Sequence, residues 1–260
     1  RSPADFVLWK AKKEGEPSWP SPWGEGRPGW HIECSVMAKT LLGETIDIHS
    51  GGVDLQFPHH ENEIAQSETL HDKTFARYWL HNGFITVDEE KMSKSLGNFF
   101  TLKDVAEKYD LEVLRFFLLS AHYRQPLNFS DHVMGQMKNG LERIYNAKYR
   151  LEELLEKTTA SNLSDADEEL LKAFEARTLE FEKAMDDDLN TADAITAVYN
   201  LVKDINTNLD ESSNKNLVKA AYDELIKLTN VLGLLRRAKE EITDEDILKL
   251  IDERQEARKN

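Results

Sequence analysis

The sequence predicts an α/β layer that is followed by an all-α helical bundle. Short runs at 45–49 and 83–87 carry the strand signals of the first part, and helix-like stretches separate them. From about residue 103, apolar residues recur at spacings of three and four, as on helices that pack through one face. With 260 residues, the chain is long enough for one large domain or two smaller ones.

The first part begins with residues 1–28, which are rich in Pro, Gly and Trp and predict an ordered loop. A helix is expected over 30–41, because its apolar side chains fall on one face, and Gly43 is a natural stop. The alternating residues 45–49 predict a strand. We expect Ser50-Gly51-Gly52 to end that strand.

Further along, Pro58 is expected to open a second helix that runs to about Leu70. The stretch 83–87 predicts another strand. Beyond residue 103 we expect four or five helices, with one apolar face between Met134 and Leu155 and another from Leu217 to Leu232 that ends at Gly233. Such apolar faces are typical of packing surfaces.

Composition restricts the function classes. The apolar fraction of 40%, with 11 Phe and 5 Trp, is enough for a sizeable core. No apolar run approaches the roughly 18 residues of a membrane span, so no membrane partner is expected. The single cysteine, Cys34, excludes an internal disulfide and fits a cytoplasmic location. The net charge of −15 gives no support for nucleic-acid binding.

One candidate metal site stands out. Cys34, His59 and Glu63 offer a thiolate, an imidazole and a carboxylate, all of which bind zinc. His59 and Glu63 are four residues apart in the helix expected after Pro58, so they share one face. A lone cysteine is often only a small buried side chain, and a His/Glu pair is often only solvated. Spacing alone leaves these alternatives open, and it leaves His60 as another possible ligand.

Two further segments suit nucleotide chemistry. Lys91-Met92-Ser93-Lys94-Ser95 sets two lysines three apart, where they can neutralise a departing pyrophosphate. An exposed basic loop is the simpler interpretation. His49-Ser50-Gly51-Gly52-Val53-Asp54 follows a strand. Its glycines allow close backbone approach, and Asp54 can accept hydrogen bonds from ribose hydroxyls or an ammonium group. A Gly-Gly pair is, however, usually only a turn.

Taken together, the motifs resemble the second half of the cysteinyl-tRNA synthetases. The matching segments follow one another in the family's order: Gly29–Ser35, His49–Asp54, Phe57–Ser67, the KMSKS pentapeptide at 91–95, Ser120–Arg124 with Pro126–Phe129, and Ala184–Thr191. Each segment is weak alone, but the ordered combination is highly specific. The resemblance also makes zinc the expected ion at the Cys34 site.

This resemblance implies a class I synthetase with a Rossmann-type core, which makes cysteinyl-adenylate from cysteine and ATP, with Mg²⁺ expected, and passes cysteine to tRNA(Cys). The residues that match family positions are Cys34, His59 and Glu63 as zinc ligands, Trp30 and His49 at the cysteine pocket, Gly51, Gly52 and Asp54 near the adenylate, and Lys91 and Lys94 as catalytic lysines, with Lys94 contacting ATP. The family's further cysteine ligand and its HIGH motif lie upstream and do not occur in these residues.

The resemblance also implies a division of the chain. Residues 1–102 correspond to the second half of the catalytic domain, 103–133 to a connecting stem-contact region, and 134–260 to an incomplete anticodon-binding domain. The segment Asp110-Leu-Glu-Val-Leu114-Arg115 resembles the DALR signature that leads into that domain. We expect a fragment that is inactive alone. Two alternatives remain: the related cysteine ligase of mycothiol synthesis, and a non-catalytic binding module derived from a synthetase.

Overall fold

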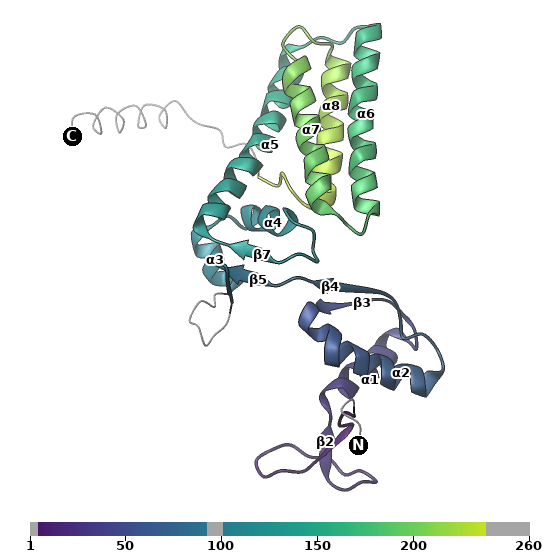
Figure 1. The fold of residues 1–260 in the computed structure, drawn as a ribbon. Coiled ribbons are helices and arrows are strands. Elements are labelled where there is room, and N and C mark those ends of the chain that lie inside the picture. The colour runs from purple at the N-terminus through teal and green to yellow at the C-terminus, as the bar shows by residue number, and fades with distance from the viewer. Residues whose placement is uncertain (1–4, 93–100, 238–260) are drawn as a thin grey trace, which may run out of the picture. The chain divides into compact units, whose positions relative to one another are not determined.

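The computed structural model describes residues 5–92 and 101–237 (Figure 1). The chain divides into two compact units. The first comprises Arg1–Leu102 with Ala121–Val133, and the second comprises Lys103–Ser120 with Met134–Asn260. The predicted class is confirmed, since short parallel sheets with helices precede a helical part. None of the helices in the described ranges combines the length and apolar character that a membrane span requires.

The first unit opens with a strand pair where the sequence suggested a loop. Strand β1 (Trp9–Ala11) pairs antiparallel with β2 (Gly26–Pro28). Helix α1 (Trp30–Leu42) confirms the predicted first helix, and it ends at Gly43, whose φ of 103° favours glycine. The strands escaped prediction because each has only three residues and depends on its partner.

A parallel strand pair carries the next segment. Strand β3 (Ile46–Gly52) runs beside β4 (Ala76–Asn82). The expectation that Ser50-Gly51-Gly52 ends the strand is wrong, because these residues pair with Leu80, His81 and Asn82 of β4. Strand β4 was not predicted at all. Pairing with a strand that is distant in sequence, rather than a local pattern, holds both segments extended.

Between these strands lie two short helical turns, η1 (Val53–Leu55) and η2 (Gln56–His60), and then helix α2 (Glu61–His71). Pro58 lies in η2, and the regular α-helix begins three residues after it, so the predicted helix exists but starts later. A small core joins α1 and α2 to the strand pair. Ile46, Phe75 and Ala76 are buried there, with Ala38, Ile64 and Trp79 packed against them.

A second sheet completes this unit. Strand β5 (Ile85–Val87) pairs antiparallel with β6 (Glu90–Lys91) and parallel with β7 (Leu127–Phe129). β5 lies within the predicted strand at 83–87. β7 contradicts the expectation that the chain is helical from about residue 103. It joins the sheet through pairing with β5, a contact between residues some forty positions apart.

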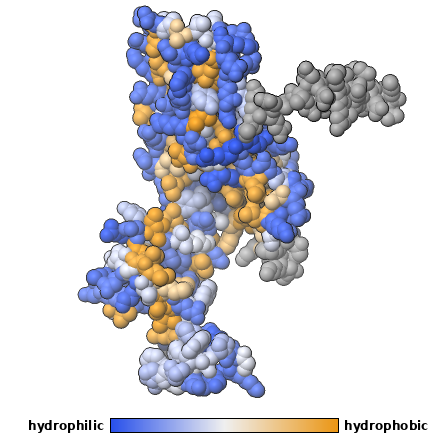
Figure 2. Space-filling view, turned by 180° about the vertical axis from the view of Figure 1, so that it is seen from behind, coloured by the Kyte–Doolittle hydropathy of each residue, from blue (hydrophilic) through white to orange (hydrophobic). Residues whose placement is uncertain are grey.

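Six helices lie between residues 101 and 237, against the four or five expected. They are α3 (Leu102–Lys108), α4 (Leu111–Leu119), α5 (Asp131–Lys157), α6 (Asp165–Asp186), α7 (Thr191–Asn208) and α8 (Lys215–Leu232). The last three lie side by side along α5 (Figure 1). The predicted apolar face of α5 is buried at Met134, Leu141 and Leu151. On the face seen in Figure 2, this helical part is mostly hydrophilic outside.

The segment that resembles a DALR signature holds the end of α8. Arg115 Nε donates to the carbonyl oxygen of Leu232 at 2.6 Å. Glu112 accepts from the Tyr145 hydroxyl at 2.6 Å and from the backbone nitrogen of Leu235 at 2.5 Å. The same hydroxyl accepts from the backbone nitrogen of Arg237 at 2.8 Å. Tyr145 therefore joins α4, α5 and the chain that leaves α8.

Replacing Tyr145 by phenylalanine should lower the free energy of unfolding by about 1–3 kcal/mol, because two partly buried groups, the Glu112 carboxylate and the Arg237 backbone nitrogen, lose a hydrogen-bond partner. Guanidinium unfolding followed by circular dichroism measures this loss. Tyr222→Phe is the matched control, since that hydroxyl lies 3.4 Å from Glu152 and its bond is weak. Equal losses for both variants would contradict the role given to Tyr145.

Candidate metal centre

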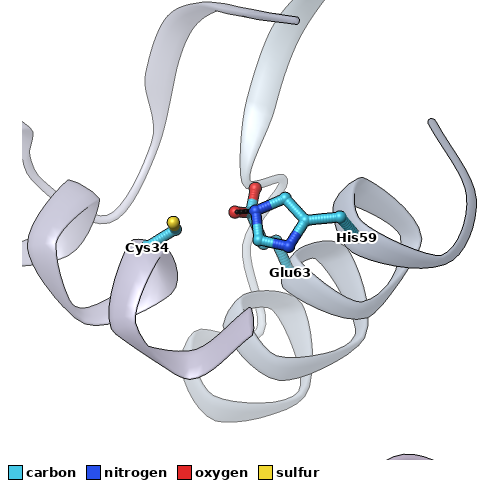
Figure 3. Close-up of side chains that lie close together, drawn as sticks. All are labelled: Cys34, His59 and Glu63. Carbon is cyan, nitrogen blue, oxygen red and sulfur yellow. Dashed lines mark ion pairs between the residues drawn. The ribbon is translucent and has the colours of Figure 1, made fainter. Parts of the chain in front are cut away.

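Three elements bring a sulfur, a nitrogen and an oxygen together (Figure 3). Cys34 lies on α1, His59 in η2 and Glu63 in the first turn of α2. Their ligand atoms all lie within 4.8 Å of one another. In Figure 3 the Cys34 sulfur faces the space beside the other two side chains. The set predicted from spacing is thus assembled in space, and its service as a ligand set stays a prediction.

Glu63 is the centre of the group. Its side chain is fully buried, with 0% exposed. Oxygen Oε1 lies 2.8 Å from His59 Nε2, yet among the described residues no hydrogen bond of good geometry reaches it, and the Cys34 thiol is the other donor close to this carboxylate. This short distance without a well-aligned hydrogen bond is what we expect if Glu63 Oε1 and His59 Nε2 both point toward one metal ion. A buried carboxylate oxygen without a well-aligned donor is costly, and a bound cation removes that cost.

Glu63 and Cys34 differ in their protonation when no ion is bound. Burial raises the pKa of Glu63, but the hydrogen bond from His49 and the charges of nearby imidazoles outweigh it, so the carboxyl pKa lies below its usual value. Burial, and then the charge of Glu63, raise the pKa of the Cys34 thiol. Without an ion this thiol stays protonated. A coordinated metal ion reverses that, because it binds the thiolate.

A second layer orients His59. Nδ1 of His31 lies 2.9 Å from Nδ1 of His59, so the other nitrogen of His59, Nε2, faces Glu63. Burial and the neighbouring His59 lower the pKa of His31. The lowered pKa favours the neutral His31 ring, which can then hydrogen-bond to His59. Metal-binding histidines are commonly held in this way through their second nitrogen. Trp30 stacks on His59 with ring centroids 4.4 Å apart, and 54% of Trp30 is exposed.

The segment around His49 lies next to this group. His49 Nε2 bonds the second carboxylate oxygen of Glu63, and the place of His49 at a cysteine pocket stays a prediction. Gly51 and Gly52 are extended residues of β3, and neither requires a positive φ. A side chain at Gly51 would meet the His60 ring at 3.0 Å, and one at Gly52 would meet Asp54. Gly51 therefore has close neighbours of its own in the fold, whereas only the movable end of the exposed Asp54 side chain lies near Gly52.

Sequence reasoning missed part of the cluster. His31 and His81 were not singled out, and His60 was considered only as an alternative to His59. His60 Nδ1 lies 2.8 Å from His81 Nε2. Burial, followed by the neighbouring His49, lowers the pKa of His60 to about 4. One signal was available, because most of the eight histidines fall between residues 31 and 81.

The KMSKS pentapeptide lies mostly outside the described residues. Lys91 ends β6, while Lys94 and its neighbours at 93–100 are not described. Asp54 lies in η1 with its side chain exposed, beside Gly52. Five of the predicted site residues form one cluster in the structure: Cys34, His59, Glu63, Trp30 and His49. The proposed lysine contact to ATP has no structural description.

Comparison with known proteins gives the family. Residues 1–139 match the tRNA synthetases class I (C) catalytic domain, and residues 180–236 match the DALR domain. Because the first match covers more than half of the chain, the chain belongs to the class I (C) tRNA synthetase family. The DALR match covers the end of α6, all of α7 and α8, and the chain that follows them.

Two curated relatives are cysteine–tRNA ligases. The one from Clostridioides difficile (strain 630) is 58% identical over 260 residues, which is 100% of this chain and 56% of the relative. The one from Lachnospira eligens is 55% identical over 258 residues, which is 99% of this chain and 55% of the relative. The chain therefore spans about half the length of these relatives.

Solved structures share the fold at low identity. A leucyl-tRNA synthetase of Agrobacterium radiobacter K84, in a ternary complex with tRNA and LeuAMS, has a TM-score of 0.64 at 16% identity, over 85% of this chain and 34% of that one. Methionyl-tRNA synthetase of Mycobacterium tuberculosis, in complex with methionyl-adenylate, has a TM-score of 0.52 at 20% identity, over 72% and 39%. At this level of identity, both comparisons show a shared fold and nothing more.

Replacing His31 by alanine should weaken metal binding by the intact protein about 10–100-fold, because His59 loses the partner that orients its ring. Competition with a chromophoric chelator measures the affinity. His132→Ala is the matched control, since His132 is exposed at the start of α5. An unchanged affinity in His31→Ala would show that His31 does not support the centre.

Proposed function

We propose that the chain is the cysteine-recognising part of a cysteine–tRNA ligase, which joins cysteine to tRNA(Cys) through a cysteinyl adenylate made from ATP. The observation that carries this proposal is the Cys34, His59 and Glu63 group, in a chain that is 58% identical to a cysteine–tRNA ligase. The activity belongs to the whole protein, of whose relatives this chain spans about half. We place the ligase in the cytoplasm.

The ion proposed for the centre is zinc. Thiolate, imidazole and carboxylate together match its ligand preference, and the resemblance adds a further cysteine from outside these residues. When bound, zinc supplies a Lewis acid that takes the substrate cysteine as its thiolate. Cys34, His59 and Glu63 hold the ion, and His31 keeps His59 Nε2 turned toward it.

The need for such an ion follows from the substrate. Cysteine and serine differ by one atom, sulfur in place of oxygen. A pocket that separates near-isosteres by shape alone gains only about 1–3 kcal/mol. Recognition of a thiolate by a thiophilic ion uses a much larger chemical difference. The neighbouring residues then have positional roles: Trp30 and His49 border the ligand group, against His59 and Glu63 respectively.

The nucleotide end of the reaction is proposed for the loop residues. Lys91 and Lys94 neutralise the charge that grows on the leaving pyrophosphate, together with Mg²⁺. Gly51 and Gly52 allow the backbone to approach the adenylate, and the Asp54 carboxylate accepts hydrogen bonds from it. The division into 1–102, 103–133 and 134–260 is proposed as catalytic, stem-contact and anticodon-binding parts.

The intact protein should charge tRNA(Cys) with cysteine in an ATP-dependent reaction. Acid-gel or filter assays with labelled cysteine measure the product. Transfer of cysteine to an amino sugar but not to tRNA would favour a mycothiol-type ligase. Absence of both reactions, in folded protein that retains its metal, would favour a binding module.

Changing Cys34 to alanine should remove most of the zinc and reduce the preference for cysteine over serine, because the ion loses a thiolate ligand. Metal analysis and ATP–pyrophosphate exchange with each amino acid measure the two effects. Cys34→Ser is the matched variant, since it keeps the side-chain shape and removes only the sulfur. Full zinc content with normal discrimination in both variants would refute the role of Cys34.

A further inference from the structure

The second oxygen of Glu63 faces another set of possible ligands. His49, His60 and Glu63 offer ligand atoms that all lie within 4.8 Å of one another. This set shares only Glu63 with the Cys34 group. Glu63 Oε1 lies beside His59, whereas Oε2 bonds His49 Nε2. The carboxylate thus stands between two sets of ligand atoms, one on each oxygen.

The imidazoles of the second set are held in place. His49 and His60 have ring centroids 4.6 Å apart, and Trp79 packs on both at 4.8 and 5.3 Å. Nδ1 of His60 lies 2.8 Å from Nε2 of His81. An outer hydrogen bond of this kind fixes the ring of a metal-binding histidine. The rings are therefore pre-positioned, and a bound ion would cost little reorganisation.

Space beside His60 is kept open by a glycine. A Cβ at Gly51 would lie 3.0 Å from His60 Cε1, 3.0 Å from Leu55 Cδ1 and 3.2 Å from His60 Nε2. These contacts are tighter than ordinary van der Waals packing, so any side chain at this position crowds the nitrogen that is not bonded to His81. Gly51 has no positive φ that would require glycine. The missing side chain at Gly51 leaves clearance for both the Leu55 methyl group and the His60 ring.

More imidazole is present than the carboxylate needs. One donor satisfies Glu63 Oε2, and His49 supplies it. His60 is buried beside them, and one of its ring nitrogens lies within 4.8 Å of the ligand atoms of His49 and Glu63. A histidine that only filled space would not need a nitrogen at this position. Two imidazoles and a carboxylate suit zinc, cobalt, nickel or copper. Two ions about 3.5–4 Å apart are common in two-metal sites.

We propose that His49, His60 and Glu63 form a second divalent-metal site, with Glu63 bridging it to the ion at Cys34 and His59. The second site has no thiolate and shares its single carboxylate. This site therefore binds its ion more weakly than the Cys34 site, and it fills second, when the metal is in excess. Of the His49 side chain, 23% is exposed, which gives an ion a path from solvent.

Cobalt(II) titration of the intact, metal-free protein tests this. The first equivalent should produce the near-ultraviolet band of a thiolate–cobalt bond. A further equivalent should add visible d–d absorption without increasing that band, for a total of about two ions, one for each ligand set. Saturation at about one ion per chain, with no second phase in equilibrium dialysis up to about 1 mM metal, would overturn the proposal.

Three variants assign the two phases. His60→Ala should lose the second phase and keep the thiolate band. Cys34→Ala should reduce the band, since the further cysteine remains in the intact protein, and keep the second phase. Gly51→Ala, which keeps all ligands, should weaken the second phase about tenfold or more through crowding of His60. His132→Ala should behave as wild type. A second phase unchanged in His60→Ala would overturn the proposal.

These outcomes separate the second site from the proposed function. A missing thiolate band with an intact second phase in the wild-type protein would refute the Cys34 centre alone. A normal band without a second phase would refute the second site alone. Circular dichroism of each variant confirms that a lost phase reflects lost ligands in a folded protein.

Discussion

The buried carboxylate of Glu63 is the constraint on which the first unit depends. A fully buried charge costs several kcal/mol unless partners compensate it. Here His49 bonds one oxygen, and the other lies 2.8 Å from His59 without a hydrogen bond of good geometry. These partners come from β3 and η2, and Cys34 comes from α1. The core of Ile46, Phe75 and Ala76 keeps these elements together, so ordinary packing fixes the geometry of the centre.

The donor set explains why such a centre suits a cysteine ligase. Shape separates cysteine from serine poorly, whereas affinity for sulfur separates them well. Two neighbouring rings position the ligand His59: His31 contacts its Nδ1 atom, and Trp30 stacks on its ring. In the helical unit, Tyr145 and Arg115 hold the end of α8 in a comparable way. In both units, a few polar side chains fix the ends of elements that apolar packing assembles.

Local periodicity was enough to predict several parts of the structure. The helix over Trp30–Leu42, the stop at Gly43 and the apolar face of α5 all follow from spacing within one segment. The shared face of His59 and Glu63 follows in the same way. Strands β4 and β7 could not be predicted, because distant pairing holds them extended. Likewise, His31 and His81 join the cluster only through tertiary contacts with His59 and His60.

We propose above all that Cys34, His59 and Glu63 hold a zinc ion that recognises cysteine through its sulfur. X-ray absorption at the zinc edge of the intact protein tests this most directly. We expect a mixed coordination shell with sulfur at about 2.3 Å and nitrogen and oxygen at about 2.0–2.2 Å from the zinc. Added cysteine should increase the sulfur contribution, and added serine should leave it unchanged. A shell of nitrogen and oxygen alone, or one that does not respond to cysteine, would contradict this role of the zinc ion.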